Sequence, residues 1–176
     1  MTSRADPPGT NLPDAEEALA SLADRMRAGV AHGAVFVGIY SGGAWIAERL
    51  AKLLPGDHPV GYIDVSFYRD DFASKGLKAG ARRSALPFDV GGASIVLIDD
   101  VLYTGRSTRA AINELFDYGR PASIELAVLV DRGGRELPIE PTYVGARVAC
   151  ARSLSIVLSR AADGKLALGV EEGGGK

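Results

Sequence analysis

The stretch that decides the fold reads VLIDDVLYTGRST, from Val96 to Thr108. It begins with an unbroken apolar run, which is typical of a strand covered on both faces of a sheet. Two acids follow, Asp99 and Asp100, and then a small, hydroxyl-rich loop. Ligands of open α/β sheets bind outside the carboxyl ends of the strands, so this order places polar groups where a ligand is expected.

The loop after the acids has the composition of an anion site. It leads into a helix expected over 106–119, whose first N–H groups and dipole favour a bound anion. Gly105 permits close approach of the backbone, and the hydroxyl donors around it are Thr104, Ser107 and Thr108. The carboxylates before the loop accept hydrogen bonds well, which suits sugar hydroxyls next to a phosphate monoester. The two halves together predict a site for a ribose 5-phosphate.

A second turn, IYSGGAW, repeats this device at Ser41, Gly42 and Gly43. Two glycine-bearing turns at the carboxyl ends of strands are able to hold two phosphate groups, one at each end of a sugar. That describes a phosphoribosyl pyrophosphate (PRPP). The chain lacks both G-x-G-x-x-G and G-x-x-x-x-G-K-[ST], the motifs of two competing nucleotide sites.

Outward from these motifs, strands and helices alternate along the chain. Helices are expected over 14–29, 44–56 and 106–119, and strands over 34–40, 60–68, 94–99 and 123–130. This alternation predicts an α/β fold with a mostly parallel central sheet flanked by helices. From Asp131 onward, shorter segments predict a small subdomain at the carboxyl edge of the sheet. We expect one domain over 14–171, with a flexible leader (1–13) and a flexible tail (172–176).

The composition limits the class of protein. The chain has 176 residues, of which 47% are apolar and 24% charged, enough for one globular core. Its formal net charge of -2 gives no overall attraction to nucleic acid or to an anionic membrane. The single cysteine, Cys150, cannot form an internal disulfide, and no run reaches the ~20 apolar residues of a membrane span. We expect a protein of the reducing cytoplasm with no membrane partner.

The motifs carry a resemblance to a known family. VLIDDVLYTGRST is similar to the PRPP signature of type I phosphoribosyltransferases. Together with DVSFYRDDF and YVG, it resembles the PyrR family, pyrimidine-operon regulators with uracil phosphoribosyltransferase activity. The resemblance implies a sheet core with a small hood and a mobile flap, and a reaction in which uracil and Mg²⁺-bound PRPP give UMP and pyrophosphate. It also implies a homodimer or higher homo-oligomer and, in some family members, UMP-promoted binding of a pyr mRNA leader.

The resemblance further implies roles for individual residues. Asp99 and Asp100 would hold the ribose hydroxyls during catalysis. The 5-phosphate would bind at Thr104, Gly105, Arg106, Ser107 and Thr108, and the pyrophosphate would lie against Tyr40, Ser41, Gly42 and Gly43. The flap would span about 68–89 and contribute Arg69, hood elements would lie mainly at 131–160, and Asp131 and Arg132 would approach the base and the metal. Mg²⁺ would be held mainly through PRPP, with no direct protein ligand. Arg25 and Arg27 in the first helix are the candidates for RNA contact.

Other interpretations stay open at the level of sequence. Adjacent acids after a buried strand also occur in the metal or phospho-acceptor sites of receiver-type folds, and SGG also suits a plain tight turn. Ser41 and Gly42 stand where better-known PyrR proteins carry threonine and arginine, which removes a cation that would face pyrophosphate, and Gly134 replaces a usual histidine. The main hypothesis is a uracil phosphoribosyltransferase. The alternatives are a UMP-responsive RNA-binding regulator with vestigial catalysis and a transferase for another base.

Overall fold

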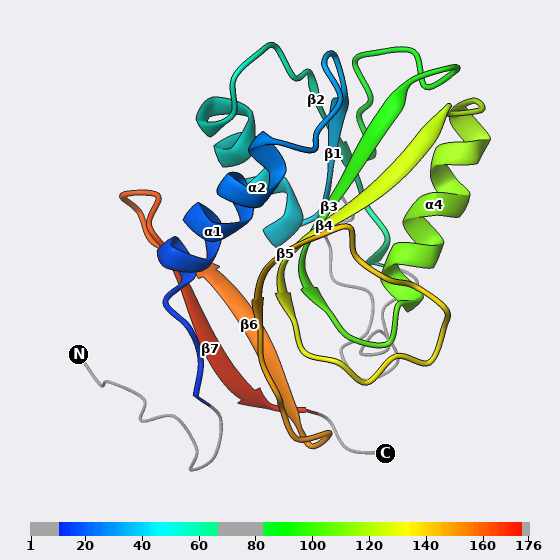
Figure 1. Cartoon of the computed structure of the whole chain (residues 1–176). Helices are drawn as coiled ribbons and strands as arrows, with labels where there is room; N and C mark the ends of the chain where they lie inside the picture. The colour runs from blue at the N-terminus through cyan, green and yellow to red at the C-terminus, as the bar shows by residue number, and fades with distance from the viewer. Residues whose placement is uncertain (1–10, 67–82, 174–176) are drawn as a thin grey trace.

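The computed structural model describes residues 11–66 and 83–173. Its centre is a five-stranded sheet in the order β2-β1-β3-β4-β5, in which every neighbouring pair is parallel (Figure 1). The strands are β1 (Val35–Ile39), β2 (Val60–Ile63), β3 (Ser94–Leu102), β4 (Ser123–Asp131) and β5 (Tyr143–Arg147). The parallel α/β sheet expected from the alternating pattern is confirmed.

Helices cover both faces of the sheet, with α1 and α2 on one side and α4 on the other (Figure 1). Their bounds are α1 (Ala15–Arg27), α2 (Gly42–Leu53) and α4 (Arg106–Tyr118). Along β3, Val96 and Ile98 pack on the side of α1 and α2, whereas Ile95 and Leu97 pack on the side of α4. Burial of both faces explains why this strand reads as an unbroken apolar run. None of the described helices is both long and apolar enough to cross a bilayer.

Two further strands form an antiparallel hairpin beside the main sheet. They are β6 (Leu154–Arg160) and β7 (Leu166–Glu172). The hairpin packs Ile156 and Leu166 into the core on the side of α1 and α2. The sequence places most of the hood at 131–160, but β5 within that range pairs with β4 as an edge strand of the main sheet. The difference arises because the short apolar run Tyr143–Ala146 finds a parallel partner in β4, a long-range pairing that no local pattern encodes.

A carboxylate on α1 joins that helix to α2 and to the hairpin. Glu16 accepts two hydrogen bonds from the guanidinium of Arg49 on α2, at 3.2 and 2.7 Å, and one from the backbone N–H of Leu166 in β7, at 2.8 Å. The Arg49 guanidinium, and after it the Leu166 N–H, lowers the pKa of Glu16 below its usual value. These contacts fix the hairpin against both helices.

Replacing Glu16 with glutamine is expected to lower the free energy of unfolding at pH 7 by about 1 kcal/mol, because a charge-assisted contact is lost. A carboxyl whose pKa is lowered by folding stabilises the fold above its unfolded pKa, here 4.5, and this stabilisation disappears as the pH falls through the folded-state pKa. Urea unfolding from pH 7 downward should therefore show wild type and variant converging. Glu17→Gln is the matched control, since Glu17 is exposed in the same helical turn. An equal effect of both substitutions would contradict the assignment.

Candidate active site

The acidic pair lies at the open carboxyl end of the sheet. The pairing of β1 with β3 ends at Gly38 and Ile98. Asp99 and Asp100 therefore lie beyond the residues of β3 that pair with β1. Asp99 is only 4% exposed, and Asp100 is half-buried. Each carboxylate accepts the backbone N–H of the next residue, at 2.9 Å in both cases. The acids stand within the strand and not after it, because β3 runs on to Leu102.

The glycine turn packs directly on this acidic pair. A Cβ atom on Gly42 would lie 2.3 Å from Oδ2 of Asp100, and one on Gly43 would lie 2.3 Å from the carbonyl oxygen of Ile98. Neither position accepts a side chain unless β3 or its acids move. The peptide bond between Tyr40 and Ser41 is cis. The two motifs that the sequence analysis singled out are therefore in contact, and the glycines are required by that contact.

The second loop enters α4 through Gly105. This residue has a φ of 91°, in the left-handed region that favours glycine, and a Cβ there would lie 3.0 Å from Cγ1 of Ile139. The carbonyl oxygen of Thr104 accepts the backbone N–H groups of Glu136 and Leu137, at 3.0 and 3.1 Å. The segment after β4 thus fixes the loop, and the first turn of α4 presents N–H groups that have no partner within the helix.

Three other side chains of this loop differ in their surroundings. The Thr108 hydroxyl is 1% exposed and has no hydrogen-bond partner among the described residues. An unsatisfied buried hydroxyl is uncommon in folded proteins. Arg106 turns its guanidinium toward Glu136, with Nε and Nη2 at 3.0 and 2.6 Å from the same carboxylate oxygen. Ser107, which lies between Arg106 and Thr108 in the sequence, is half-buried.

Asp131, at the end of β4, is the centre of an ion-pair cluster. Its carboxylate is 4% exposed. One oxygen accepts the N–H of Gly133 at 3.0 Å and pairs with Arg135 at 2.9 Å, and the other accepts a hydrogen bond from Arg147 at 2.7 Å. Neither arginine was predicted as a site residue, because the spacing of arginines in the sequence does not show which of them reaches Asp131. These partners fill most of the carboxylate's acceptor capacity, and its role at the base and metal stays a prediction.

Arg132 is also buried, with 7% of the residue exposed. Its guanidinium donates to the carbonyl oxygens of Leu154, Ala151 and Cys150, at 2.7, 3.0 and 3.3 Å. It also lies over the ring of Tyr103, 3.9 Å from the centroid. Tyr103 precedes the loop of residues 104–108, and the three carbonyls belong to the segment that enters β6. Arg132 therefore joins the loop to the hairpin, a structural role that its residue type did not indicate.

The predicted flap, 68–89, is described only at its end. Arg69 and the rest of 67–82 lie outside the described residues. In the described part, Ala85 exchanges two backbone hydrogen bonds with Tyr62 in β2, at 2.8 and 2.9 Å. The end of the predicted flap is therefore anchored to the edge of the main sheet.

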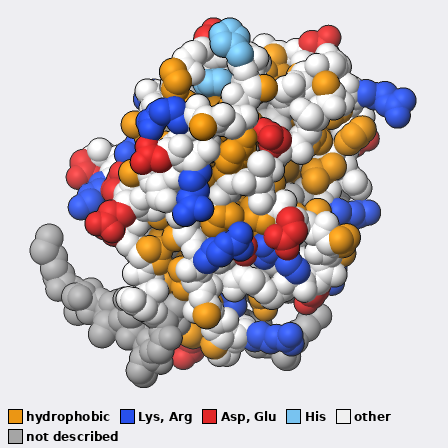
Figure 2. Space-filling model, in the orientation of Figure 1, with side chains coloured by type: hydrophobic (Ala, Val, Ile, Leu, Met, Phe, Trp, Pro, Cys, Tyr) orange, Lys and Arg blue, Asp and Glu red, His pale blue; other side chains and the backbone are white. Residues whose placement is uncertain are grey.

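The two arginines predicted to contact RNA, Arg25 and Arg27, lie exposed in the last turn of α1. Arg27 forms an ion pair with Asp24 of the same helix. On the face shown in Figure 2, basic and acidic side chains are interspersed and do not gather into one basic patch. This arrangement offsets the local positive charge on which RNA affinity depends.

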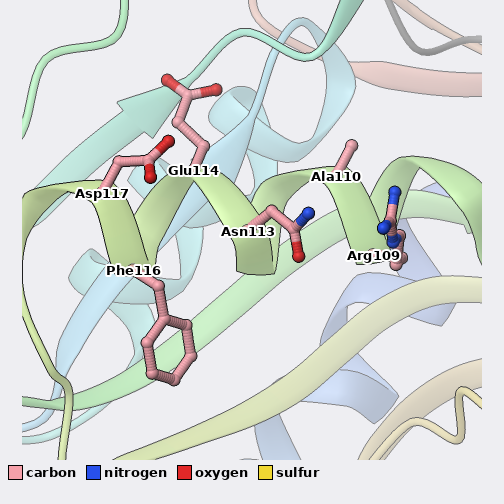
Figure 3. Close-up of a pocket in the computed structure, with 6 residues that line it drawn as sticks. All are labelled: Arg109, Ala110, Asn113, Glu114, Phe116 and Asp117. Atoms are coloured by element: carbon pink, nitrogen blue, oxygen red, sulfur yellow. The ribbon is translucent and has the colours of Figure 1, made fainter.

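A hollow on the outer side of α4 is separate from these features. Its volume is about 470 Å³, and the side chains around it all project from this one helix (Figure 3). They are Arg109, Ala110, Asn113, Glu114, Phe116 and Asp117. None of them belongs to the acidic pair or to the two loops, so the candidate site is the carboxyl edge of the sheet and not this hollow.

Sequence comparison gives this arrangement a family context. The profile of the phosphoribosyl transferase domain matches residues 10–148. A bifunctional protein PyrR of Ralstonia nicotianae is 55% identical over 155 residues, which cover 86% of this chain and 88% of that protein. A bifunctional protein PyrR of Pseudomonas paraeruginosa is 49% identical over 152 residues, which cover 84% of this chain and 89% of that protein.

Solved structures show the same fold at lower sequence identity. A hypoxanthine-guanine phosphoribosyltransferase of Bacillus anthracis superposes with a TM-score of 0.63 at 16% identity, covering 78% of this chain and 82% of that one. A purine phosphoribosyltransferase of Pyrococcus horikoshii superposes with a TM-score of 0.56 at 28% identity, covering 76% of this chain and 81% of that one. The fold is that of type I phosphoribosyltransferases, as the resemblance implied.

Proposed function

This chain belongs to the PyrR family of type I phosphoribosyltransferases, and on this premise we propose that it transfers the phosphoribosyl group of PRPP to uracil. The products are UMP and pyrophosphate. The observation that carries the proposal is the packing of Gly42 against Asp100, which sets an acidic pair next to a glycine turn at the open end of the sheet. A sugar with a phosphate group at each end matches that combination of carboxylates and anion loops.

Each part of PRPP is assigned to one part of the site. The 5-phosphate meets the loop of residues 104–108, where helix N–H groups, hydroxyls and the left-handed Gly105 favour an anion. The pyrophosphate lies against the turn of residues 40–43. The ribose hydroxyls donate to Asp99 and Asp100, which follow the last β1–β3 pair.

The reaction requires positioning and charge stabilisation, and no protein nucleophile is assigned. The bond between C1 of the ribose and the pyrophosphate oxygen breaks, and pyrophosphate leaves with the bonding electron pair while C1 gains positive character. N1 of uracil forms the new bond to C1 and releases its proton. The carboxylates of Asp99 and Asp100 orient the ribose and offset the positive charge as it develops. Their backbone hydrogen bonds at 2.9 Å hold these side chains in place before substrate arrives, which reduces reorganisation in the transition state.

Mg²⁺ bound with PRPP supplies further neutralisation of the leaving pyrophosphate. The acidic pair provides carboxylate oxygens, the ligand type that Mg²⁺ prefers, next to the turn assigned to pyrophosphate. Within residues 11–66 and 83–173, no group of three or more side chains could hold a metal by itself. We therefore propose that PRPP supplies most of the ion's ligands, with Asp99 and Asp100 beside it.

The turn of residues 40–43 contributes no cation to the pyrophosphate. Gly42 stands where better-known family members carry arginine, and a Cβ at this position would lie 2.3 Å from Oδ2 of Asp100, so a side chain here would require the Asp100 side chain to move. Backbone N–H groups and the start of α2 remain as the local donors. The missing positive charge must be supplied by Mg²⁺ and by residues outside this turn.

RNA regulation ranks below transfer chemistry for this chain. The PyrR resemblance implies that UMP promotes mRNA binding in some members, and the relatives are named bifunctional. The predicted contact residues are Arg25 and Arg27, and the ion pair of Arg27 with Asp24 offsets part of their charge. We expect any leader binding through this face to be weak and sensitive to salt.

The proposed function is tested by incubating the protein with PRPP, Mg²⁺ and one of several free bases: uracil, cytosine, hypoxanthine or guanine. We expect UMP and pyrophosphate in equal amounts with uracil and no nucleotide with the purines. Formation of a nucleotide from a different base would favour a transferase for that base. No nucleotide from any base, together with a rise in Tm on addition of UMP, would favour the regulator with vestigial catalysis.

A further inference from the structure

The turn assigned to pyrophosphate has few side-chain anchors of its own. Gly42 and Gly43 have no side chain, and Ser41, at the N-cap of α2, makes no side-chain capping bond within the part of the chain that the structure describes. A loop that must hold its N–H groups in a fixed direction therefore depends on what flanks it. Tyr40 is the first residue of the turn, and α2 begins within the turn at Gly42.

One side chain contacts both flanks of the turn. Tyr62 lies in β2, opposite Gly38 of β1 in the parallel register. Its ring stacks on the ring of Tyr40, with centroids 5.3 Å apart and 26° between the planes. Its hydroxyl donates to Oε1 of Glu48 on α2, at 3.0 Å. Tyr62 thus connects the first residue of the turn to the helix that continues from the turn.

The hydrogen bond from Tyr62 to Glu48 is itself supported. Burial, and after it the neighbouring Glu48 carboxylate, raises the pKa of Tyr62 to about 12, so its hydroxyl stays protonated and able to donate at physiological pH. The other oxygen of Glu48 lies 3.7 Å from the guanidinium of Arg160 in β6, which in turn lies over the ring of Trp45. The Glu48 carboxylate is therefore held by Arg160 of the hairpin while it accepts the hydrogen bond from the Tyr62 hydroxyl.

The backbone of Tyr62 has a second connection. It exchanges two hydrogen bonds with Ala85, at 2.8 and 2.9 Å, at the end of the predicted flap. The same residue thus lies between the proposed pyrophosphate turn and the anchored base of that segment. A side chain in this position is able to fix the turn relative to the sheet edge from which the predicted flap departs.

We propose that Tyr62 is a positioning residue for the turn of residues 40–43, and that its stacking on Tyr40 and its bond to Glu48 set the affinity for ligands that carry pyrophosphate. The inference rests on the proposed function, which assigns pyrophosphate to this turn. UMP carries no pyrophosphate and is bound through the other loop, so its affinity should not depend on Tyr62. This difference separates positioning of the turn from a general effect on the fold.

The test compares Tyr62→Leu, which removes both contacts, with Tyr62→Phe, which keeps the ring and removes the hydroxyl. The control is Tyr118→Leu, the same change at a 51% exposed tyrosine at the C-terminal end of α4. Calorimetry measures binding of Mg²⁺-pyrophosphate and of UMP, and initial rates give KM for PRPP and for uracil. We expect Tyr62→Leu to raise the pyrophosphate Kd and the KM for PRPP about tenfold, with a smaller rise for Tyr62→Phe and no change for Tyr118→Leu.

Three outcomes would overturn the inference. They are unchanged pyrophosphate affinity in Tyr62→Leu, an equal loss of UMP and pyrophosphate affinity in that variant, and a wild-type protein that does not bind pyrophosphate. A failure of the proposed function gives a result that differs from these three outcomes, because calorimetry measures binding and requires no turnover. A wild-type protein that binds pyrophosphate in a Tyr62-dependent manner but makes no nucleotide would refute the transferase and leave the positioning role intact.

Discussion

Replacing Arg132 with alanine is expected to lower the free energy of unfolding by about 3 kcal/mol or more, the largest stability loss predicted for this chain. The guanidinium satisfies three backbone carbonyl oxygens, those of Cys150, Ala151 and Leu154, and packs on Tyr103. Alanine would remove the donor from these part-buried acceptors and, because Arg132 itself is buried, would open a cavity between the loop of residues 104–108 and the hairpin. Each unsatisfied acceptor costs about 1–3 kcal/mol, and these costs are not additive.

Urea unfolding followed by circular dichroism measures this loss. Arg152→Ala is the matched control, because Arg152 is exposed in the same segment that Arg132 holds. Arg132→Lys keeps the charge but not the planar fork that reaches several carbonyls at once, so it should recover only part of the stability. If Arg132→Ala unfolds at the same urea concentration as Arg152→Ala, the structural role of Arg132 is wrong.

The features that the sequence predicted are those with local signals. The main sheet was visible because strands buried on both faces read as short, continuous apolar runs. The two loops were visible because an anion site needs glycine and hydroxyl residues next to a helix start, and IYSGGAW and TGRST both show this. Their contact through Gly42 and Asp100 follows from the parallel topology, which brings the carboxyl ends of β1 and β3 together.

The features that the sequence could not supply depend on partners distant in the chain. Arg132 has the residue type of a ligand-binding side chain, yet its hydrogen bonds go to carbonyl groups of residues 150–154, and carbonyl groups are the same in every residue. Asp131 forms ion pairs with Arg135 and Arg147, and the sequence does not show which of its many arginines these partners are. Strand β5 was not predicted, because its five residues carry too little pattern to show that they form a strand or which edge of the sheet they join.

The same limit applies to Tyr62. In sequence it is one aromatic residue in an alternating strand, where tyrosine is common and is usually interpreted as a packing residue. Its functional interest comes from the simultaneous contacts with Tyr40 and Glu48, which lie before and after the glycine turn. A residue that acts by holding another residue in place leaves no motif of its own.

The acidic pair carries the largest expected effect on catalysis. Replacing both Asp99 and Asp100 with asparagine should lower kcat by about 10³-fold, because the amides hydrogen-bond locally but no longer offset positive charge at C1 of the ribose. The two single variants should differ. Asp99 is 4% exposed, so its replacement also lowers stability, whereas Asp100 is half-buried beside the turn and its replacement should affect kcat with little change in Tm.

Initial rates of UMP formation at saturating PRPP and uracil, with Tm measured on the same preparations, separate these effects. Asp163→Asn is the matched control, because Asp163 also accepts a backbone N–H, that of Lys165 at 3.0 Å, but lies exposed in the turn between β6 and β7. Near-wild-type turnover in the double variant would show that the ribose is held elsewhere. A fall in kcat that only parallels the fall in Tm would show that the two acids stabilise the fold and do not take part in catalysis. A fall in kcat for Asp100→Asn at unchanged Tm assigns the carboxylate to the chemistry, because the amide keeps the size of the side chain but loses its charge and replaces one acceptor oxygen with an N–H donor.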